Sequence, residues 1–288
     1  MHTTKLICPN EPALLDRLEK RNLCVRVSSP EAIVPAANKA RERNHLICVI
    51  CDAETSFDEM NVEESWQDIP IALIAPTFGK FRNVSRNLAL FKKLNLRVYL
   101  PCDEGGLVGA RLLASLGIPT GIVFDKVPRP DWEALADLMT YALLGMAAHA
   151  PIEPFQTMAD CCRQGRSEDW GRAIFDDPSS YLHIDAMGRT ALSRRELIAG
   201  EFVAQDLSEL DTPVVAKAVA NRRDAWQKLF LDNHFCARCG GWRLCRGRFA
   251  DGRDEPDDCG EFFQDMMDVI EQSCKNLGPQ QPVEKWRP

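Results

Sequence analysis

Short apolar segments alternate with longer amphipathic stretches over the first half of the chain, from Leu6 to about Gly145. The apolar segments predict strands at residues 24–27, 46–51, 71–74, 97–100 and 121–124. The stretches between them have helical spacing and predict helices after Ser29-Pro30, over 84–94, between Gly106 and Gly117, and after Asp131. This order is typical of β/α units around a mainly parallel sheet. Because an eight-unit barrel needs about 250 residues, these elements fit a partial barrel or a small open sheet better, and we expect a partial β/α barrel over residues 1–150.

The pattern changes at about Ala148, and residues 151–288 are expected to form a second, smaller, cysteine-rich domain. Two alternating segments within 181–191 flank a turn at Gly188, which predicts a β-hairpin. Helices are expected from Thr212 to about Leu231 and over 261–274, followed by a frayed tail from Gly278.

Charge, hydropathy and cysteine content exclude several classes of protein. The 288 residues have a formal charge of -7, which argues against a nucleic-acid-binding protein. No apolar segment is long enough to span a membrane, and the first residues do not resemble an export signal. We therefore expect a cytoplasmic protein with no membrane partner. In a reducing cytosol, the 12 cysteines favour metal or redox chemistry over disulfides.

Four of these cysteines are concentrated near the C-terminus, where Cys236, Cys239, Cys245 and Cys259 have the spacing C-x2-C-x5-C-x13-C. Four thiolates can hold either a tetrahedral zinc ion or a [4Fe-4S] cube, so the ligand set alone leaves both open. Structural zinc sites usually pair one C-x2-C with another, and this asymmetric spacing favours the cube. Four ordinary buried cysteines are the remaining alternative. Nearby arginines add positive charge at Arg238, Arg243, Arg246 and Arg248.

The spacing, together with the preceding hairpin sequence 184–188, resembles the SPASM domain of radical SAM peptide-maturation enzymes. The resemblance covers roughly residues 161–274. Stand-alone SPASM-domain proteins of the GeoRSP type are the nearest comparison. The resemblance implies that Cys236, Cys239, Cys245 and Cys259 hold one auxiliary [4Fe-4S] cluster.

The family commonly holds a second auxiliary cluster, and this sequence departs from that pattern. Ser193 and Phe249 stand where two of its cysteine ligands are expected. A third ligand would correspond to Cys161 or Cys162, but the gap from Cys162 to Gly188 is longer than the family pattern allows. The resemblance therefore implies one cluster.

The cysteines of the first half do not complete a radical SAM motif. That chemistry requires C-x3-C-x2-C, and no three cysteines of the chain have this spacing. Cys48 and Cys51 have the C-x2-C half, but they fall in an apolar strand and are expected to face opposite sides of it. The N-terminal region would then be a degenerate relative of the radical SAM barrel, with no SAM bound.

These observations support two main hypotheses. The first is a non-catalytic iron-sulfur accessory protein that works with a radical SAM enzyme, a precursor peptide or both in the maturation of ribosomally made peptides, by electron relay or by binding. The second is a zinc-stabilised structural adaptor without a redox role. An enzyme that uses unidentified residues of the partial barrel is a third possibility, because no catalytic constellation is recognisable.

Overall fold

The computed structural model describes residues 4–124, 130–165, 170–224, 226–249 and 259–276. The strands are β1 (Lys5–Pro9), β2 (Asn22–Val27), β3 (His45–Asp52), β4 (Ile71–Ile74), β5 (Leu96–Pro101), β6 (Thr120–Val123), β7 (Ile152–Glu153), β8 (Tyr181–Ile184) and β9 (Thr190–Ala191). The α-helices are α1 (Pro12–Arg17), α2 (Ile33–Arg41), α3 (Phe81–Phe91), α4 (Glu104–Ser115), α5 (Trp132–Leu144), α6 (Phe155–Arg163), α7 (Trp170–Ala173), α8 (Arg194–Ala199), α9 (Pro213–Arg223), α10 (Trp226–Leu231), α11 (Trp242–Cys245) and α12 (Cys259–Asn276). Short 3-10 segments are η1 (Pro30–Ala32), η2 (Phe57–Glu59), η3 (Glu64–Trp66), η4 (Leu207–Glu209) and η5 (Phe235–Arg238). None of these helices is both long and apolar enough to cross a membrane. The predicted tail from Gly278 lies outside the described residues.

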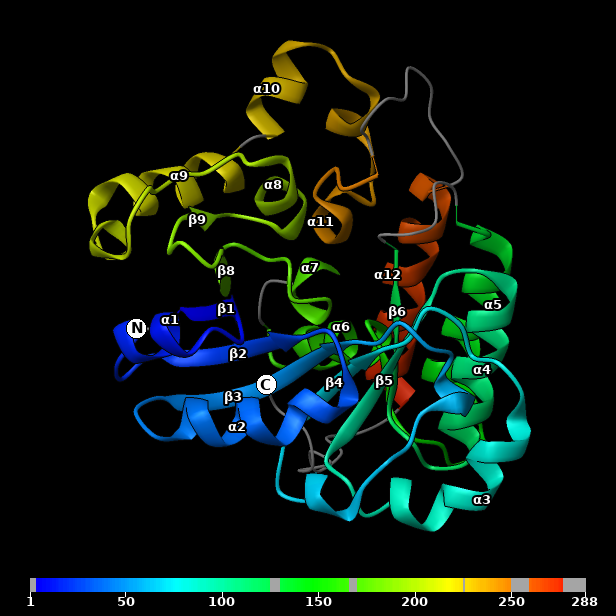
Figure 1. Cartoon of the computed structure of the whole chain (residues 1–288). Helices are drawn as coiled ribbons and strands as arrows, with labels where there is room; N and C mark the ends of the chain where they lie inside the picture. Colours follow the sequence, from blue (N-terminus) through cyan, green and yellow to red (C-terminus); the bar gives the residue numbers. More distant parts are fainter. Residues whose placement is uncertain (1–3, 125–129, 166–169, 225, 250–258, 277–288) are drawn as a thin grey trace.

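The strands form one sheet with the order β7-β6-β5-β4-β3-β2-β1-β8-β9 (Figure 1). From β1 to β7 each strand lies beside the next one in the sequence, and every pair is parallel. Helices alternate with these strands, as parallel connections require. The fold is therefore α/β with a mostly parallel sheet, consistent with a partial α/β barrel-like domain, and the sequence prediction is confirmed at this level.

Both faces of the sheet are buried, which explains why its strands are continuously apolar rather than alternating. On one face Val25 and Val49 pack in the main core with helices such as α2, whose Ala36 and Ala37 are fully buried. The opposite face has a smaller cluster, formed by Ile7, Cys24, Cys48, Ile50, Ala72, Tyr99, Phe175 and Tyr181. Helices α2 and α8–α11 lie on opposite sides of the sheet (Figure 1).

The predicted hairpin is present and extends the same sheet. Strand β8 pairs parallel with β1 and antiparallel with β9, and Gly188 has the positive φ of 90° that the turn requires. Asp185 Oδ1 accepts hydrogen bonds from the backbone N–H groups of Met187 and Arg189, at 3.0 and 2.8 Å. The sheet is thus continuous across the predicted boundary between residues 150 and 151.

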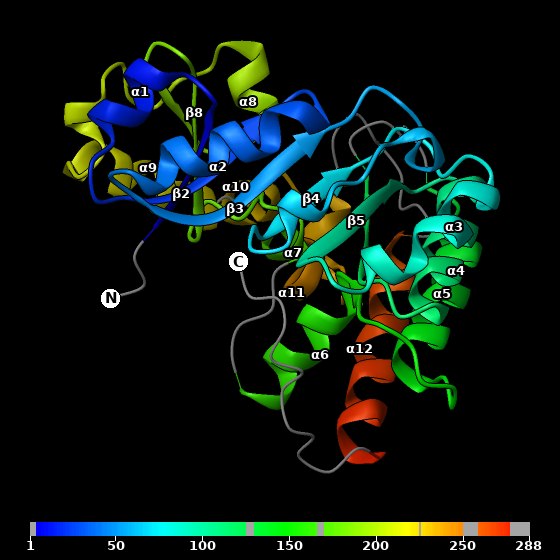
Figure 2. The same ribbon diagram turned by 60° about the horizontal axis from the view of Figure 1, so that its bottom comes forward.

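Helix α12 connects the C-terminal region to the barrel-like part. It packs against α5 and α6 (Figure 2) and buries Phe262, Phe263, Met266 and Ile270. The predicted helix over 261–274 is confirmed. The predicted helix over 212–231 is instead two helices, because α9 ends at Arg223 and α10 begins at Trp226. This break allows α10 to pack against η5, the first segment of the cysteine region.

Candidate metal centre

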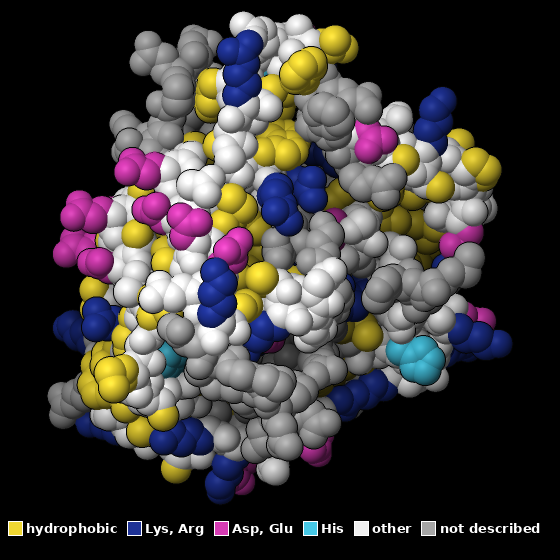
Figure 3. Space-filling model, turned by 180° about the vertical axis from the view of Figure 1, so that it is seen from behind, with side chains coloured by type: hydrophobic (Ala, Val, Ile, Leu, Met, Phe, Trp, Pro, Cys, Tyr) yellow, Lys and Arg dark blue, Asp and Glu magenta, His cyan; other side chains and the backbone are white. Residues whose placement is uncertain are grey.

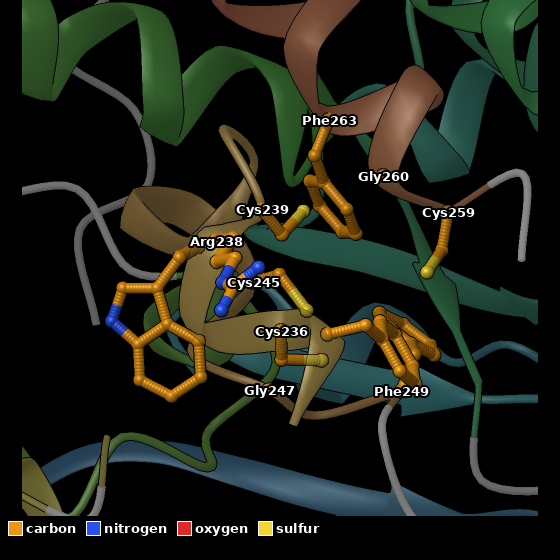
Figure 4. Close-up of a pocket in the computed structure, with 11 residues that line it drawn as sticks. Cys236, Arg238, Cys239, Cys245, Gly247, Phe249, Cys259, Gly260 and Phe263 are labelled. Carbon is orange, nitrogen blue, oxygen red and sulfur yellow. The ribbon is translucent and has the colours of Figure 1, made fainter. Parts of the chain in front are cut away.

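The four cysteines of the C-x2-C-x5-C-x13-C segment line one cavity of about 240 Å³ (Figure 4). The structure therefore brings together every residue that the spacing predicted as a metal ligand. The other lining residues are Phe235, Arg238, Trp242, Gly247, Phe249, Gly260 and Phe263.

Three elements position three of the thiols. Cys236 lies in η5, Cys245 is the last residue of α11, and Cys259 is the first residue of α12. Cys239 follows η5 directly, in extended backbone. His234, two residues before Cys236, caps η5: its Nδ1 accepts a hydrogen bond from the backbone N–H of Cys236, with 3.2 Å between the two nitrogens.

The thiols differ in exposure. Cys236, Cys245 and Cys259 are only 7%, 8% and 8% exposed, whereas Cys239 is half-buried. Cys239 Sγ lies beside the backbone of Gly260, 3.3 Å from the position that a Cβ there would take. Among the described residues, no three His, Cys, Asp or Glu side chains converge closely enough to hold a single metal ion. The four thiols surround a space instead of meeting at one point.

Cys245 has the clearest electrostatic environment. Burial raises the pKa of its thiol to about 11. Backbone N–H groups of Phe249, Gly247 and Arg248 donate to the sulfur and oppose this rise, because they favour the thiolate. The chain turns back on the sulfur through two residues with positive φ, Arg246 at 54° and Gly247 at 76°. Several amides converging on one sulfur are suited to a permanently anionic ligand.

Glycines allow the cysteine loop to lie directly on α12. A Cβ at Gly241 would be 2.5 Å from the Cβ of Phe263, and one at Gly240 would overlap the side-chain amide of Gln264. The first contact involves an atom fixed to the helix backbone and cannot relax easily. Close approach of the loop to α12 therefore depends on Gly241.

We expect Gly241→Ala to lower the free energy of unfolding by about 1–3 kcal/mol, because the added methyl overpacks a buried contact. It should also lower metal retention by pushing the loop away from Cys259. The matched control is Gly105→Ala in α4, where a Cβ would meet only Asp103 Oδ1 at 3.6 Å, an ordinary contact. Denaturant unfolding of both variants checks this. Equal stability of the two variants would contradict the packing assigned to Gly241.

Aromatic side chains close the cavity on the side of the core. Phe249 and Phe263 line it, with ring centroids 5.8 Å apart. Behind them, Trp132 lies 5.2 Å from Phe249, and Trp170 lies 5.1 Å from Phe263. These rings come from positions far apart in the sequence, and spacing offered no signal for them. They exclude water from the inner wall of the cavity.

The arginines near the thiols have different roles. Arg238 lines the cavity, whereas the guanidinium of Arg248 does not and binds Asp176 instead. Its Nη2 donates to the backbone carbonyl of Asp176 at 2.7 Å, and its Nη1 donates to the carboxylate. The guanidinium rests against Gly171, where a Cβ would overlap it. Arg248 thus ties the cysteine loop to the segment between α7 and β8.

His183 in β8 lies next to Asp176, the partner of Arg248, and is buried, with only 2% of it exposed. Its Nε2 lies 3.1 Å from the carbonyl oxygen of Phe175, which places the proton on Nε2. Burial, reinforced by the positive charges of Arg26 and Arg194, lowers the pKa of His183 to about 3. The imidazole is therefore neutral at neutral pH, and its 3.8 Å approach to Asp176 is not an ion pair.

This shift predicts a loss of stability in mild acid. The unfolded chain takes up a proton at His183 below about pH 6.5, and the folded chain does not until about pH 3. The stability that neutral His183 contributes is therefore fully present above about pH 6.5 and is lost as the pH falls from about 6.5 towards 3. Between pH 6.5 and 5 we expect a loss of about 2 kcal/mol. Denaturant unfolding of wild type and His183→Gln tests this, and an equal pH dependence in both would contradict it.

The other cysteines singled out in the sequence lie elsewhere. Cys48 packs in the smaller cluster and Cys51 in the main core, so they face opposite sides of β3, as predicted. Cys161 and Cys162 lie in α6 and do not line the cavity. Ser193 caps α8, with its Oγ accepting the N–H of Glu196 at 3.2 Å.

No family model, curated protein or solved structure matched this chain. The donor set is four thiols, the inner wall is aromatic, and backbone amides face one sulfur. This combination fits a polynuclear iron-sulfur group chemically.

Proposed function

We propose that this protein is an iron-sulfur accessory protein that holds one [4Fe-4S] cluster on Cys236, Cys239, Cys245 and Cys259. The observation that carries the proposal is that these four thiols line a single cavity. Such a cluster would supply one-electron redox chemistry when bound.

The cavity favours a cluster over zinc. A zinc ion draws four sulfurs to within about 2.3 Å of one point. Here the four thiols and seven other residues line a cavity of about 240 Å³, well above the roughly 10–15 Å³ that one water molecule needs. A cube needs this kind of space between its thiolates. The amides facing Cys245 also match the hydrogen bonds to sulfur that tune cluster potentials.

The rest of the fold supports a role without SAM chemistry. The sheet face that carries Cys24 and Cys48 is packed by Tyr99, Phe175 and Tyr181, all of them at most 3% exposed. Four thiolates would also leave no iron open for SAM. The partial barrel is followed by the hairpin and the cysteine segment. This order supports the interpretation of the chain as a degenerate radical SAM-like protein with a SPASM-like domain over residues 151–288.

The biological partners follow from that resemblance. We propose that the protein works beside a radical SAM enzyme in the maturation of a ribosomally made peptide, and that it contacts the enzyme, the precursor peptide or both. Its contribution would be electron relay or binding rather than catalysis.

The visible absorption spectrum and zinc content of anaerobically purified protein test the proposal. We expect the broad brown absorption of iron-sulfur charge transfer and no stoichiometric zinc. A colourless protein with one zinc per chain would overturn the cluster and leave a zinc-stabilised adaptor.

A further inference from the structure

A short segment before β8 lies between the sheet and the cysteine region. It comprises α7 and the next three residues, 170–176, and we call it the strap. Helix α7 lies between the sheet and α11 (Figure 1), and it packs against α11, the helix that ends at Cys245. The strap therefore contacts an element that carries one of the proposed cluster ligands.

The strap also covers the smaller apolar cluster of the sheet. Its Phe175 ring lies 5.7 Å from the ring of Tyr99 and 5.6 Å from that of Tyr181. The same cluster buries Cys24 and Cys48 completely. These two cysteines lie opposite each other in the pairing of β2 with β3. A strap that moved away from the sheet would expose their thiols.

Two side chains of the sheet hold the backbone of the strap. Tyr99 Oη donates to the carbonyl oxygen of Ala173 at 3.2 Å. His183 Nε2 donates to the carbonyl oxygen of Phe175 at 3.1 Å. Phe175 has a positive φ of 62°, which is costly for a bulky residue and persists only where the surrounding contacts impose it. The strap therefore keeps its position against backbone strain, so the loss of a contact favours its release.

A further contact comes from the cysteine loop. Arg248 Nη2 donates to the carbonyl oxygen of Asp176 at 2.7 Å, and Nη1 donates to the carboxylate of the same residue. The guanidinium also lies directly against Gly171 in α7. The backbone N–H of Arg248 is one of those directed at the sulfur of Cys245. One residue thus contacts both a proposed cluster ligand and the strap.

We infer that a cluster bound at the four cysteines holds the strap on the sheet through Arg248. The inference rests on the proposed function. Cluster-bound Cys245 is a thiolate, and an N–H group donates a stronger hydrogen bond to an anion than to a neutral thiol. Cluster binding therefore fixes the turn that carries Arg248 and keeps its guanidinium on Asp176. When the cluster is lost, this turn is free to move, the strap is released and Cys24 and Cys48 become accessible.

Alkylation of individual cysteines by N-ethylmaleimide, followed by mass spectrometry of the digested protein, tests the inference. The cluster-loaded wild type is compared with the same protein after a chelator has removed its iron. We expect Cys24 and Cys48 to react about tenfold faster or more after iron removal, which is the size of effect expected from the loss of a hydrogen bond to a charged group. Cys8 and Cys51 are the internal controls, because they are buried on the opposite face of the sheet and should react at unchanged rates.

The variant Asp176→Asn tests the contact itself. It keeps the size of the side chain but removes the ion pair with Arg248. We expect it to keep its iron and to label the two cysteines under the strap about tenfold faster or more than the wild type. Asp206→Asn is the matched control, because it removes an exposed ion pair with Arg17. Charges of both signs occur in several places on the surface, as the face in Figure 3 shows, and an exposed pair contributes little. The control should label like the wild type.

Iron and sulfide measured on the same samples separate the two proposals. Equal labelling of Cys24 and Cys48 in loaded and iron-free protein overturns the role of the strap alone. An iron-loaded Asp176→Asn variant that labels like the wild type does the same, and so does acceleration of all four buried cysteines together, because it would show a general loosening of the fold. If Asp176→Asn does not fold, the comparison of loaded and iron-free wild type decides. Wild-type protein that holds no cluster overturns the proposed function and this inference together.

Discussion

Replacing Cys245 by serine is expected to abolish iron and sulfide retention. Serine keeps the size of the side chain but cannot supply a thiolate, which is the form that binds iron. The loss of groups that only support a metal ligand costs about 10–100-fold in affinity, and loss of the ligand itself should exceed that. Cys245 is the strongest test among the four because backbone amides of three residues are directed at its sulfur. Iron and sulfide analysis after anaerobic purification measures the effect.

Cys274→Ser is the matched control for this change. Cys274 is a half-buried thiol in α12 that does not line the cavity, and its Sγ contacts the carbonyl oxygen of Ala159 at 4.0 Å. A serine hydroxyl can make the same contact. We expect full iron content in this variant. Iron retained in Cys245→Ser, or lost in Cys274→Ser, would contradict the assigned ligand set.

Trp170→Ala is expected to have the largest effect on folding. Trp170 is fully buried, and its ring lies 5.2 Å from Phe124 and 5.1 Å from Phe263. Its removal leaves a cavity between the sheet and α12, and we expect the free energy of unfolding to fall by about 3–5 kcal/mol. Metal retention should fall as well, because Phe263 lines the thiol cavity. Denaturant unfolding and iron analysis of the same sample measure the two effects.

The variant Trp170→Phe shows how much of the lost stability comes from packing of the ring and how much from the indole N–H. It retains an aromatic ring and removes a buried Nε1–H that has no hydrogen-bond partner among the described residues. We expect a cost below about 1.5 kcal/mol and normal iron content. An alanine variant as stable as the phenylalanine variant would show that the ring does not support the cavity.

The parallel strands could be predicted because both of their faces are buried, which leaves short continuous apolar segments between turns. The two strands at residues 5–9 and 152–153 were missed: the first ends in Pro9, and the second has only two residues. Helix α6 was also missed, although Phe155, Met158 and Ala159 have helical spacing. Its start next to Pro154 obscured that spacing. The break after α9 was not predicted, because the apolar residues there give no strong amphipathic pattern to interrupt.

The gathering of Cys236, Cys239, Cys245 and Cys259 at one cavity could be predicted, because cysteines that serve one centre must be suitably spaced, and spacing is visible in a sequence. The aromatic wall could not, because Trp132, Trp170 and Phe263 meet only through tertiary packing. The ion pair between Arg248 and Asp176 could not be predicted either, because the two residues are 72 positions apart and meet only through tertiary packing. The turn at Arg246-Gly247 had a visible signal, the glycine two residues after Cys245, which allows the chain to fold back on the sulfur.

The most direct test of the central claim is the native mass of the anaerobically purified chain. We predict a mass increase over the polypeptide equal to four irons and four sulfides, present in the wild type and absent after Cys239→Ala. A mass increase equal to one zinc ion, or an unmodified polypeptide mass after anaerobic reconstitution with iron and sulfide, would contradict the iron-sulfur account of this cavity.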